Sequence, residues 1–121
     1  MRDKKTNLKL VLDHVETIAI VGASDKSDRD SYKVMKFLKD FGYRIFPVNP
    51  NILDARILGH ECYPDLSAIE ERIDMVDVFR AKEHILSILN DAIKIKAKVF
   101  WMQEGLYCCL LYTSDAADEQ W

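Results

Sequence analysis

The stretch TIAIVGASDKSDRDSY, residues 17–32, has the pattern of a buried strand that runs into one glycine and then into a polar loop. The apolar run from Ile18 to Val21 is short and is closed by Gly22, which is typical of a central strand in a parallel sheet. Free backbone N–H groups in the turn after such a strand can hold a phosphate oxygen. The stretch therefore predicts an α/β domain with a phosphate-binding turn.

Apolar residues recur at helix or strand spacing along the rest of the chain. Helices are predicted where apolar positions lie three or four residues apart, over residues 4–15, 31–40 and 83–95. Strands are predicted at the short apolar runs in residues 43–50, 73–79 and 98–102, with one further short strand near Ile57 or Cys62. Strands that alternate with helices form a parallel sheet covered on both faces, because the crossovers are right-handed. We therefore predict one doubly wound, Rossmann-like α/β domain.

The predicted helix at residues 31–40 has one apolar face, made of Tyr32, Met35, Leu38 and Phe41. Gly42 follows at the position of a helix C-cap. We therefore expect this face to be buried against the sheet.

Two further local patterns concern Pro47 and Ser67. Pro47 lies inside the second strand, which predicts a lost ladder hydrogen bond or a bulge. Ser67 is expected to cap a turn of helix, because Glu70 follows three residues later as in a capping box.

Composition and charge are those of an ordinary soluble domain. Of the 121 residues, 49% are hydrophobic and 31% are charged, and no run of 18 apolar residues could span a membrane. The N-terminal residues show no secretory signal, so we expect a cytoplasmic protein. The net charge of −3 is spread over interspersed acids and bases, which argues against a nucleic-acid partner. Three cysteines, two of them adjacent, make neither a disulfide framework nor a zinc site.

The last stretch, CLLYTSDAADE from Cys109 to Glu119, does not continue the strand–helix pattern. Its eleven residues resemble the translated end of a transposase adapter used in sequencing libraries. We therefore predict a domain at residues 1–107 and a non-native, adapter-like tail at residues 108–121, with the gene cut off before its natural end. The segment from Cys109 to Trp121 holds three acids and no base, so its removal changes the net charge from −3 to 0.

Small, polar and charged residues follow four of the predicted strands. In open α/β sheets ligands bind at the carboxyl ends of the strands, so these residues are expected to converge. They are Gly22, Ala23, Ser24, Asp25 and Lys26 after the first strand, Val48, Asn49 and Pro50 after the second, Phe79 and Arg80 after the third long run, and Trp101, Met102, Gln103 and Gly105 after the last.

Each of these residues also has a purely structural interpretation. Gly22 fits any strand-to-helix turn, and Asn49 with Pro50 is ordinary turn chemistry. Arg80 suits a solvated position, and Trp101 suits the core. The agreement of four strand ends, and no single residue, favours a ligand site.

A nicotinamide cofactor is disfavoured by two missing features. The glycine positions that follow Gly22 in a G-x-G-x-x-G fingerprint hold Ser24 and Ser27. The second strand ends in Asn49 and Pro50, with no acid to bind the ribose of such a cofactor.

No catalytic or metal-binding set emerges from the sequence. His14, His60 and His84 are scattered, and none has a partner at metal-ligand spacing on one element. Ser24 is not part of a G-x-S-x-G nucleophile elbow, and Cys62 has no evident activating base. We therefore predict no catalytic residue and no metal.

Five blocks carry a resemblance to a known family: IAIVGASDKSDRDSYKVMKFL, YRIFPVNPN, ILGHECYPDL, VDVFR and AKVFWMQEG. From about Thr17 to Gly105 the chain resembles the CoA-binding domain family of small bacterial proteins, which are similar to the nucleotide-binding domain of the succinyl-CoA synthetase α subunit. The resemblance implies coenzyme A as the ligand. The implied phosphate contacts are Gly22, Ala23, Ser24, Lys26, Ser31 and Tyr32. The implied adenosine and pantetheine path follows Val48, Asn49, Pro50, Phe79 and Arg80, and Trp101, Gln103 and Gly105 close its far side.

The sequence departs from the family in two ways. The phosphorylated histidine of the synthetase lies in a following domain that this sequence lacks, so the resemblance does not imply ligase activity. The family also continues past Gly105 with a helix and a final strand, where this sequence has the adapter-like stretch. One edge of the sheet is therefore expected to be open.

The expected function is non-catalytic binding of CoA or an acyl-CoA at the carboxyl ends of the strands. Two alternatives stay open. One is an NAD(P)-binding or redox-sensing module of similar fold, and the other is the CoA-binding subunit of an acyl-CoA ligase that needs a separate catalytic partner.

Overall fold

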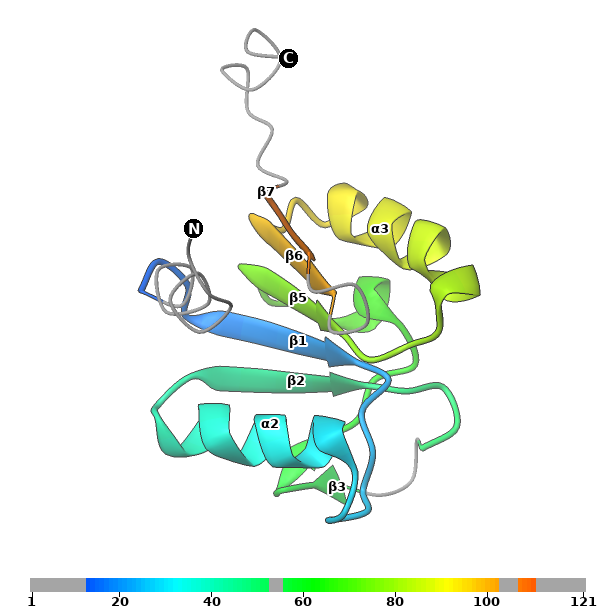
Figure 1. Cartoon of the computed structure of the whole chain (residues 1–121). Coiled ribbons are helices and arrows are strands. Elements are labelled where there is room, and N and C mark those ends of the chain that lie inside the picture. Colours follow the sequence, from blue (N-terminus) through cyan, green and yellow to red (C-terminus); the bar gives the residue numbers. More distant parts are fainter. Residues whose placement is uncertain (1–12, 53–55, 103–106, 111–121) are drawn as a thin grey trace, which may run out of the picture.

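The computed structural model describes residues 13–52, 56–102 and 107–110 (Figure 1). Its elements follow one another in this order: β1 (Thr17–Val21), α2 (Asp30–Asp40), β2 (Arg44–Val48), β3 (Arg56–Ile57), β4 (His60–Glu61), a 3-10 helix (Leu66–Ala68), β5 (Met75–Val78), a 3-10 helix (Lys82–His84), α3 (Ile85–Lys94), β6 (Val99–Met102) and β7 (Tyr107–Leu110). The predicted helix at residues 4–15 falls almost wholly outside the described residues.

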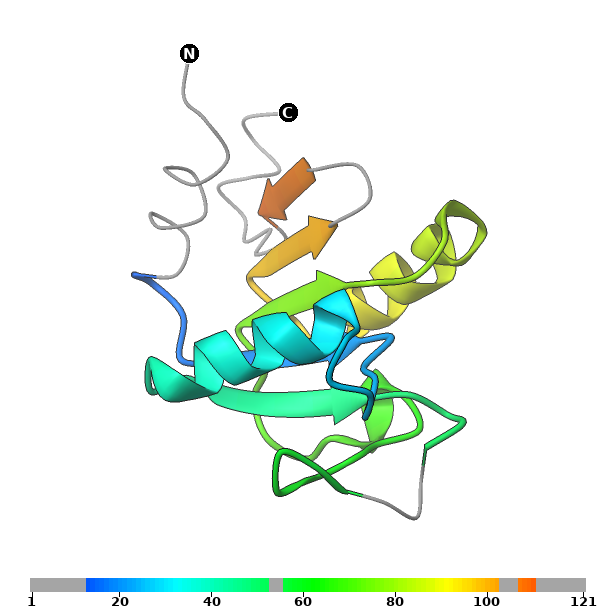
Figure 2. The same cartoon turned by 60° about the horizontal axis from the view of Figure 1, so that its bottom comes forward.

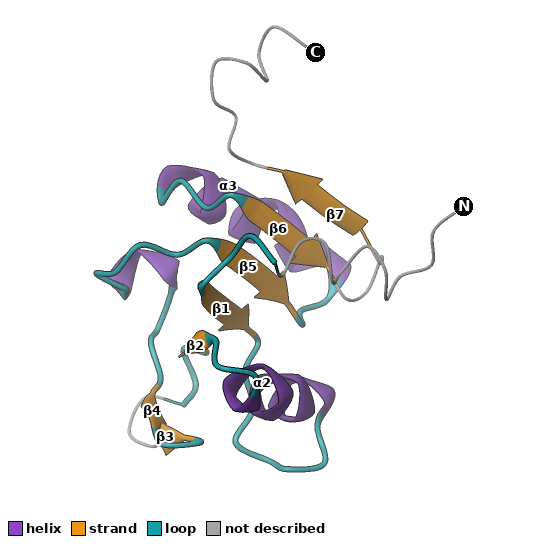
Figure 3. Ribbon diagram, turned by 90° about the vertical axis from the view of Figure 1, so that its left-hand side faces the viewer, coloured by secondary structure: helices purple, strands orange, loops and turns teal. Residues whose placement is uncertain are grey.

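Five strands form one sheet in the order β2-β1-β5-β6-β7 (Figure 3). The first four are parallel, and β7 pairs with β6 in the antiparallel direction. From β1 the chain crosses to β2 on one side and later to β5 on the other. Such a reversal is the switch point at which open α/β sheets bind ligands. The prediction of a doubly wound, Rossmann-like sheet is confirmed.

Two apolar layers hold the sheet between its helices, α2 in front of the sheet and α3 on the other side (Figure 2). Ile18 and Ile20 of β1 pack in the layer that contains Met35 and Leu38 of α2. Ala19 and Val21 point to the opposite layer, which also contains Ala92 of α3. This alternation is that of a central strand buried on both faces.

The apolar face predicted for α2 is only partly correct. Met35 and Leu38 are buried, and Tyr32 is half-buried. Phe41 is instead 68% exposed, because it lies at the C-cap, where the chain turns away from the sheet. Its ring contacts the exposed ring of Phe37, with the centroids 4.5 Å apart. Gly42 follows with φ +97° and donates its N–H to the carbonyl of Lys39, so the predicted helix end is confirmed.

Pro47 costs no ladder hydrogen bond, because β2 is the outermost strand of the sheet. The carbonyl of Val48 faces β1 and accepts the N–H groups of Gly22 and Ala23 at 2.9 and 3.2 Å. The backbone of Pro47 therefore faces the outer edge, where its carbonyl accepts the Tyr63 N–H at 2.9 Å. The pairing of β1 with β2 is regular through Pro47, so neither predicted consequence occurs.

The capping box predicted at Ser67 is wrong. The N-cap is Asp65, whose carboxylate accepts the N–H of Ala68 at 3.0 Å and the hydroxyl of Ser67 at 2.8 Å. The turn that follows is the 3-10 helix Leu66–Ala68. The Asp65 carboxylate lies two residues before Ser67 and accepts the first free N–H of the turn, that of Ala68. The Ser67 hydroxyl therefore donates to this carboxylate and does not act as the cap.

Asp74 ties together the starts of three strands. Its Oδ2 atom accepts the N–H groups of Glu16 and Thr17 at 2.8 and 3.4 Å. Arg72 and Lys98 each place a nitrogen 3.7 Å from its Oδ1 atom. Asp74 is only 8% exposed, so these contacts are poorly replaced by water.

Replacing Asp74 with alanine is expected to lower the free energy of unfolding by about 1–3 kcal/mol, since a partly buried N–H loses its acceptor. Urea unfolding followed by circular dichroism measures this change. The matched control is Asp40→Ala, which removes an exposed carboxylate whose partner among the described residues is the exposed Lys36, at 3.3 Å. That variant should change stability by less than about 0.5 kcal/mol, and equal losses in both variants would refute the role of Asp74 as a tie between strands.

The edge of the sheet beside β6 is not open, contrary to expectation. Tyr107–Leu110 forms β7, in which Cys109 pairs with Phe100 and Leu110 with Val99. Residues 111–121 of the predicted non-native tail lie outside the described residues.

That residues 108–121 are not native stays a prediction, which truncation can test. Deletion of residues 109–121 is expected to change the free energy of unfolding by less than about 1 kcal/mol. Deletion of residues 111–121 alone is the control, because it leaves β7 whole. A clear loss of stability in the longer deletion only would identify β7 as part of the native sheet.

Candidate functional site at the strand ends

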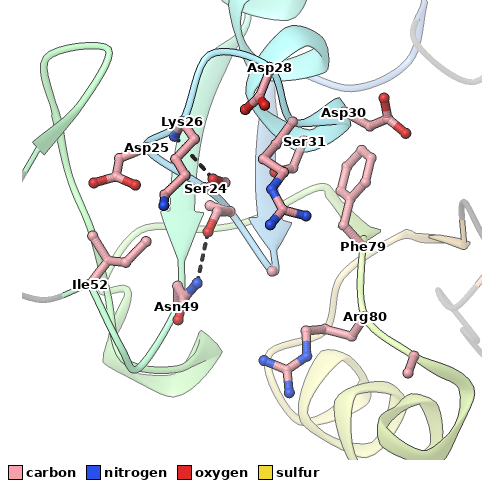
Figure 4. A pocket seen from close by; sticks show the side chains of 14 residues that line it. Ser24, Asp25, Lys26, Asp28, Asp30, Ser31, Asn49, Ile52, Phe79 and Arg80 are labelled. Atoms are coloured by element: carbon pink, nitrogen blue, oxygen red, sulfur yellow. Dashed lines mark hydrogen bonds between the residues drawn. The ribbon is translucent and has the colours of Figure 1, made fainter.

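A cavity of about 1030 Å³ lies at the carboxyl ends of β1, β2 and β5, and we refer to it as the strand-end cavity (Figure 4). Its position outside the switch point is the one expected for a ligand site in an open α/β sheet. Its lining consists of Gly22, Ala23, Ser24, Asp25, Lys26, Asp28, Arg29, Asp30, Ser31, Asn49, Ile52, Phe79, Arg80 and Ala81.

Gly22 allows the ends of β1 and β5 to meet closely. Its φ of +90° is one that residues with a side chain rarely adopt. A Cβ atom at this position would lie 2.7 Å from the carbonyl oxygen of Phe79 and 3.1 Å from Cδ of Arg80. The N–H of Phe79 also donates to the carbonyl of Val21 at 2.8 Å. The turn after β1 is thus held directly against the end of β5.

The loop from Ala23 to Arg29 is ordered by its own hydrogen bonds. The Ser24 hydroxyl accepts the Lys26 N–H at 3.0 Å, and the Lys26 carbonyl accepts the Arg29 N–H at 3.1 Å. Arg29 is the N-cap of α2 and gives no side-chain hydrogen bond to the first turn. The first turn of α2, with Ser31 only 4% exposed, lines the cavity. The positive end of the helix therefore adjoins the site. The turn itself differs from the expectation of free N–H groups, because those of Gly22 and Ala23 donate to the Val48 carbonyl.

Asn49 braces this loop from the end of β2. Its side-chain Nδ2 donates to the Ala23 carbonyl at 2.8 Å, and its Oδ1 accepts the Asn51 N–H at 2.8 Å. Both ends of the amide are therefore engaged, and the side chain is fixed in orientation. Its own carbonyl accepts the Ile52 N–H at 3.2 Å, which closes the turn.

Both signs of charge surround the cavity. Figure 4 shows Ser24, Lys26 and Asn49 on one side and Phe79 and Arg80 on the other. Arg29 adds a third cation to the lining, and the acids Asp25, Asp28 and Asp30 belong to the same loop or to the start of α2. Anions that reach between the loop and Arg80 would meet cations from two separate elements.

Residues 16–120 of the chain match the family of CoA binding domains. The chain belongs to the CoA-binding domain family. The resemblance found in the sequence blocks is thereby confirmed.

Three relatives illustrate the range of the likeness. YneT, an uncharacterized protein of Bacillus subtilis (strain 168), is 41% identical over 102 residues, which make up 84% of this chain and 74% of YneT. An ADP-forming acetate–CoA ligase of Methanocaldococcus jannaschii is 36% identical over 64 residues, which make up 53% of this chain and 9% of the ligase. The solved structure of a hypothetical protein from Pyrococcus horikoshii OT3 has a TM-score of 0.75 at 34% identity and covers 98% of this chain and 80% of that chain.

The structure brings eight of the fourteen predicted site residues to the strand-end cavity: Gly22, Ala23, Ser24, Lys26, Ser31, Asn49, Phe79 and Arg80. Tyr32 instead packs half-buried against the layer under α2. Gln103 and Gly105 lie outside the described residues. Five further lining residues were not predicted, although each lies within three residues of one that was: Asp28, Arg29, Asp30, Ile52 and Ala81.

Val48 and Pro50 line a second, smaller cavity of about 220 Å³ on the α3 side of the strand ends. Arg80 lines both cavities, so its side chain lies where the two adjoin. The other lining residues of the smaller cavity are Val21, Pro64, Asp65, Leu66, His84, Ser87, Ile88 and Asp91.

Trp101 does not line either of these cavities. It is 2% exposed and packs in the same layer as Ile18, Met75 and Val99. Residues alternate between the two faces along β6, so Trp101 shares the face of Val99 and points into the core instead of beyond the strand end. The structure supports its interpretation as a core residue.

The described residues include neither a metal-binding cluster nor an activated thiol. In the described ranges, no group of three or more histidine, cysteine, aspartate or glutamate side chains could hold a metal ion. Burial, and to a lesser degree the charge of Asp25, raises the pKa of the Cys62 thiol, which makes it a poor nucleophile. No helix of the described residues is long and apolar enough to cross a membrane.

Proposed function

We propose that the protein binds CoA or an acyl-CoA in the strand-end cavity and catalyses no reaction by itself. The observation that carries this proposal is the braced loop after Gly22, which together with the start of α2 lines a cavity that Arg80 lines from the end of β5. Charge-assisted hydrogen bonds from Arg and backbone N–H groups are the usual means of holding a phosphate. We also keep the expectation of a cytoplasmic protein.

CoA fits this site better than a nicotinamide dinucleotide does. A domain that binds NAD has an acid at the end of its second strand for the ribose hydroxyls. In this chain Asn49 stands there, and its amide is already engaged by Ala23 and Asn51. CoA carries a diphosphate and a further phosphate, which suit the cations Lys26, Arg29 and Arg80 of the lining.

The described lining of the strand-end cavity offers no catalytic pair. It contains neither histidine nor cysteine, and its acids belong to the loop that also carries Lys26 and Arg29 or to the start of α2. A general base needs a pKa near the working pH and a position within hydrogen-bonding reach of the reacting group. Binding without chemistry is therefore the simpler proposal.

Calorimetric titration with CoA, acetyl-CoA, NAD and NADP tests the proposal. We expect CoA to bind at least about tenfold more tightly than NAD, since one additional charge-assisted hydrogen bond contributes roughly 1.5–3 kcal/mol. Equal or tighter binding of NAD would refute the CoA proposal and favour the module of similar fold that binds NAD(P).

The likeness to an ADP-forming acetate–CoA ligase favours a second candidate, a CoA-binding subunit that works with a separate catalytic protein. The matched 64 residues make up only 9% of that ligase, so a partner would have to supply the remaining chemistry. Affinity purification of the tagged protein should then recover a partner with an ATP-grasp-like domain, and the mixture should form acyl-CoA from ATP, CoA and a carboxylic acid. A mixture without this activity would leave binding alone as the function.

A further inference from the structure

His60, the first residue of β4, contains a buried nitrogen without a hydrogen-bond partner. The hairpin β3–β4 pairs Ile57 with His60 and contacts β2, the outermost strand of the sheet (Figure 3). Among the described side chains, Nε2 of His60 is the only buried nitrogen or oxygen atom for which no partner is found. Such an atom disfavours the closed arrangement around it, and in a native structure it calls for an explanation.

Cations approach His60 from two elements. Lys39 of α2 donates its Nζ to the Leu58 carbonyl at 2.8 Å, and Arg56 of β3 donates to the Gly59 carbonyl at 3.1 Å. Both cations are therefore anchored at the hairpin turn, close to the imidazole. The residues that share a cavity of about 290 Å³ with His60 are Lys39, Tyr43, Arg44, Ile45, Phe46, Glu61 and Tyr63.

These surroundings disfavour the charged form of the imidazole. Burial is the main cause that lowers the pKa of His60, and the positive charges of Lys39 and Arg56 lower it further. Glu61 is the one acid in the described lining of this cavity, and it is exposed to solvent. In the closed hairpin the imidazole is therefore favoured in its neutral form.

The hairpin is connected to the strand-end cavity through Tyr63 and Asn49. The Tyr63 N–H donates to the Pro47 carbonyl at 2.9 Å, and the Asn49 N–H donates to the Tyr63 carbonyl at 2.8 Å. The thiol of Cys62 lies 3.7 Å from the Asn49 carbonyl. Asn49 in turn donates its side-chain Nδ2 to the Ala23 carbonyl of the loop at residues 23–29. His60 is thus three residues from Tyr63 in the chain. The backbone of Tyr63 holds Asn49, and Asn49 braces the loop after Gly22.

We propose that His60 is a pH-sensitive switch, in which protonation of its half-buried imidazole opens the β3–β4 hairpin away from β2 and loosens the hold of Asn49 on the loop at residues 23–29. The effect on CoA affinity rests on the proposed function, whereas the opening of the hairpin does not.

The direction of the pH effect follows from the lowered pKa. In the open hairpin His60 has an ordinary pKa near 6.5, so the imidazole binds a proton as the pH falls below about that value. In the closed hairpin the imidazole stays neutral to a lower pH. Acidification therefore favours the open form, and stability that is complete above this pKa is lost as the pH falls toward the lower pKa of the closed form. At pH 7.5 and above the switch is closed.

Titration calorimetry with CoA at pH 7.5 and pH 5.5 tests the functional part. The phosphates of CoA titrate in the same way against every variant, so the comparison is between proteins. We expect the loss of affinity on acidification to be at least about threefold larger for the unaltered protein than for His60→Gln, which has no group to protonate. The matched control is His14→Gln, an exposed histidine at the opposite end of β1, which should behave like the unaltered protein. Equal losses in all three proteins would overturn the proposal.

NMR titration of the free protein tests the structural part and does not depend on any ligand. The amide signals of Tyr63 and Asn49 should shift with the same midpoint as the imidazole of His60. Lys39→Gln, which removes one of the two cations, should move that midpoint to higher pH, and this variant serves also if His60→Gln does not fold. Amide signals that ignore the His60 titration would refute the switch, whether or not CoA binds.

Discussion

Alanine in place of Gly22 is expected to lower the free energy of unfolding by about 2–5 kcal/mol and to abolish ligand binding. Two effects combine in this variant. A residue with a side chain is strained at the φ of +90°, which costs about 1–2 kcal/mol. Its Cβ atom would also lie 2.7 Å from the Phe79 carbonyl oxygen, and moving a backbone to relieve such a contact costs about 1–3 kcal/mol.

Gly42→Ala separates the two effects. Gly42 has a similar φ of +97°, but a Cβ atom there would meet nothing within 4 Å. This control should lose only the conformational part, about 1–2 kcal/mol, and should keep its ligand affinity. Urea unfolding measures both variants. Equal losses of stability would mean that the end of β5 yields to the new Cβ atom, so that the close approach of Gly22 and Phe79 would not be what requires a glycine.

The strands around this turn could be predicted from the sequence, because each consists of a short apolar run with a clear end. The run before Gly22 has no polar position, as expected for a strand with both faces buried, and Ile18 and Ala19 are both 0% exposed. Val48 and Phe79 likewise mark the ends of the neighbouring strands. Since parallel strands end at one edge of the sheet, the meeting of Gly22, Asn49 and Arg80 followed from the order of the elements alone.

The fate of single aromatic side chains could not be predicted in the same way. Trp101 and Phe41 both lie within two residues of an element end, yet one is 2% exposed and the other 68%. Their positions depend on what covers each face of the sheet, and the spacing of residues within one element does not contain that information. The spacing of apolar residues indicates whether a segment is a helix or a strand, whereas tertiary packing determines whether its last residues are buried.

The β3–β4 hairpin could not be predicted from the sequence because its turn lacks the usual signal. Leu58 and Gly59 both have positive φ, +53° and +83°, as in a two-residue hairpin turn. Such turns usually carry Asn-Gly or Asp-Gly, since leucine rarely adopts a positive φ. Without that signal only one short strand was expected, and the position of His60 between Lys39 and Arg56 could not be foreseen.

Removal of the Arg80 guanidinium is expected to weaken CoA binding by about tenfold or more. Arg80 is half-buried where the two cavities adjoin, and its Cδ atom lies over Gly22. A planar guanidinium there can hold a phosphate with two parallel hydrogen bonds, and a charge-assisted hydrogen bond contributes roughly 1.5–3 kcal/mol. Arg80→Ala loses both the bonds and the charge, whereas Arg80→Lys keeps the charge and should show an intermediate loss.

Lys36→Ala is the matched control for Arg80→Ala, because it removes the same charge from an exposed position on α2 that lines neither cavity. Its CoA affinity should stay within about twofold, since exposed charges at a distance are largely screened by salt. Calorimetry at one salt concentration compares the three variants with the unaltered protein, and urea unfolding shows whether each is folded. A folded Arg80→Ala variant that binds CoA as tightly as the unaltered protein would remove Arg80 from the site. The phosphates would then have to rest on the loop after Gly22 and the start of α2, where the remaining cations of the lining, Lys26 and Arg29, are found.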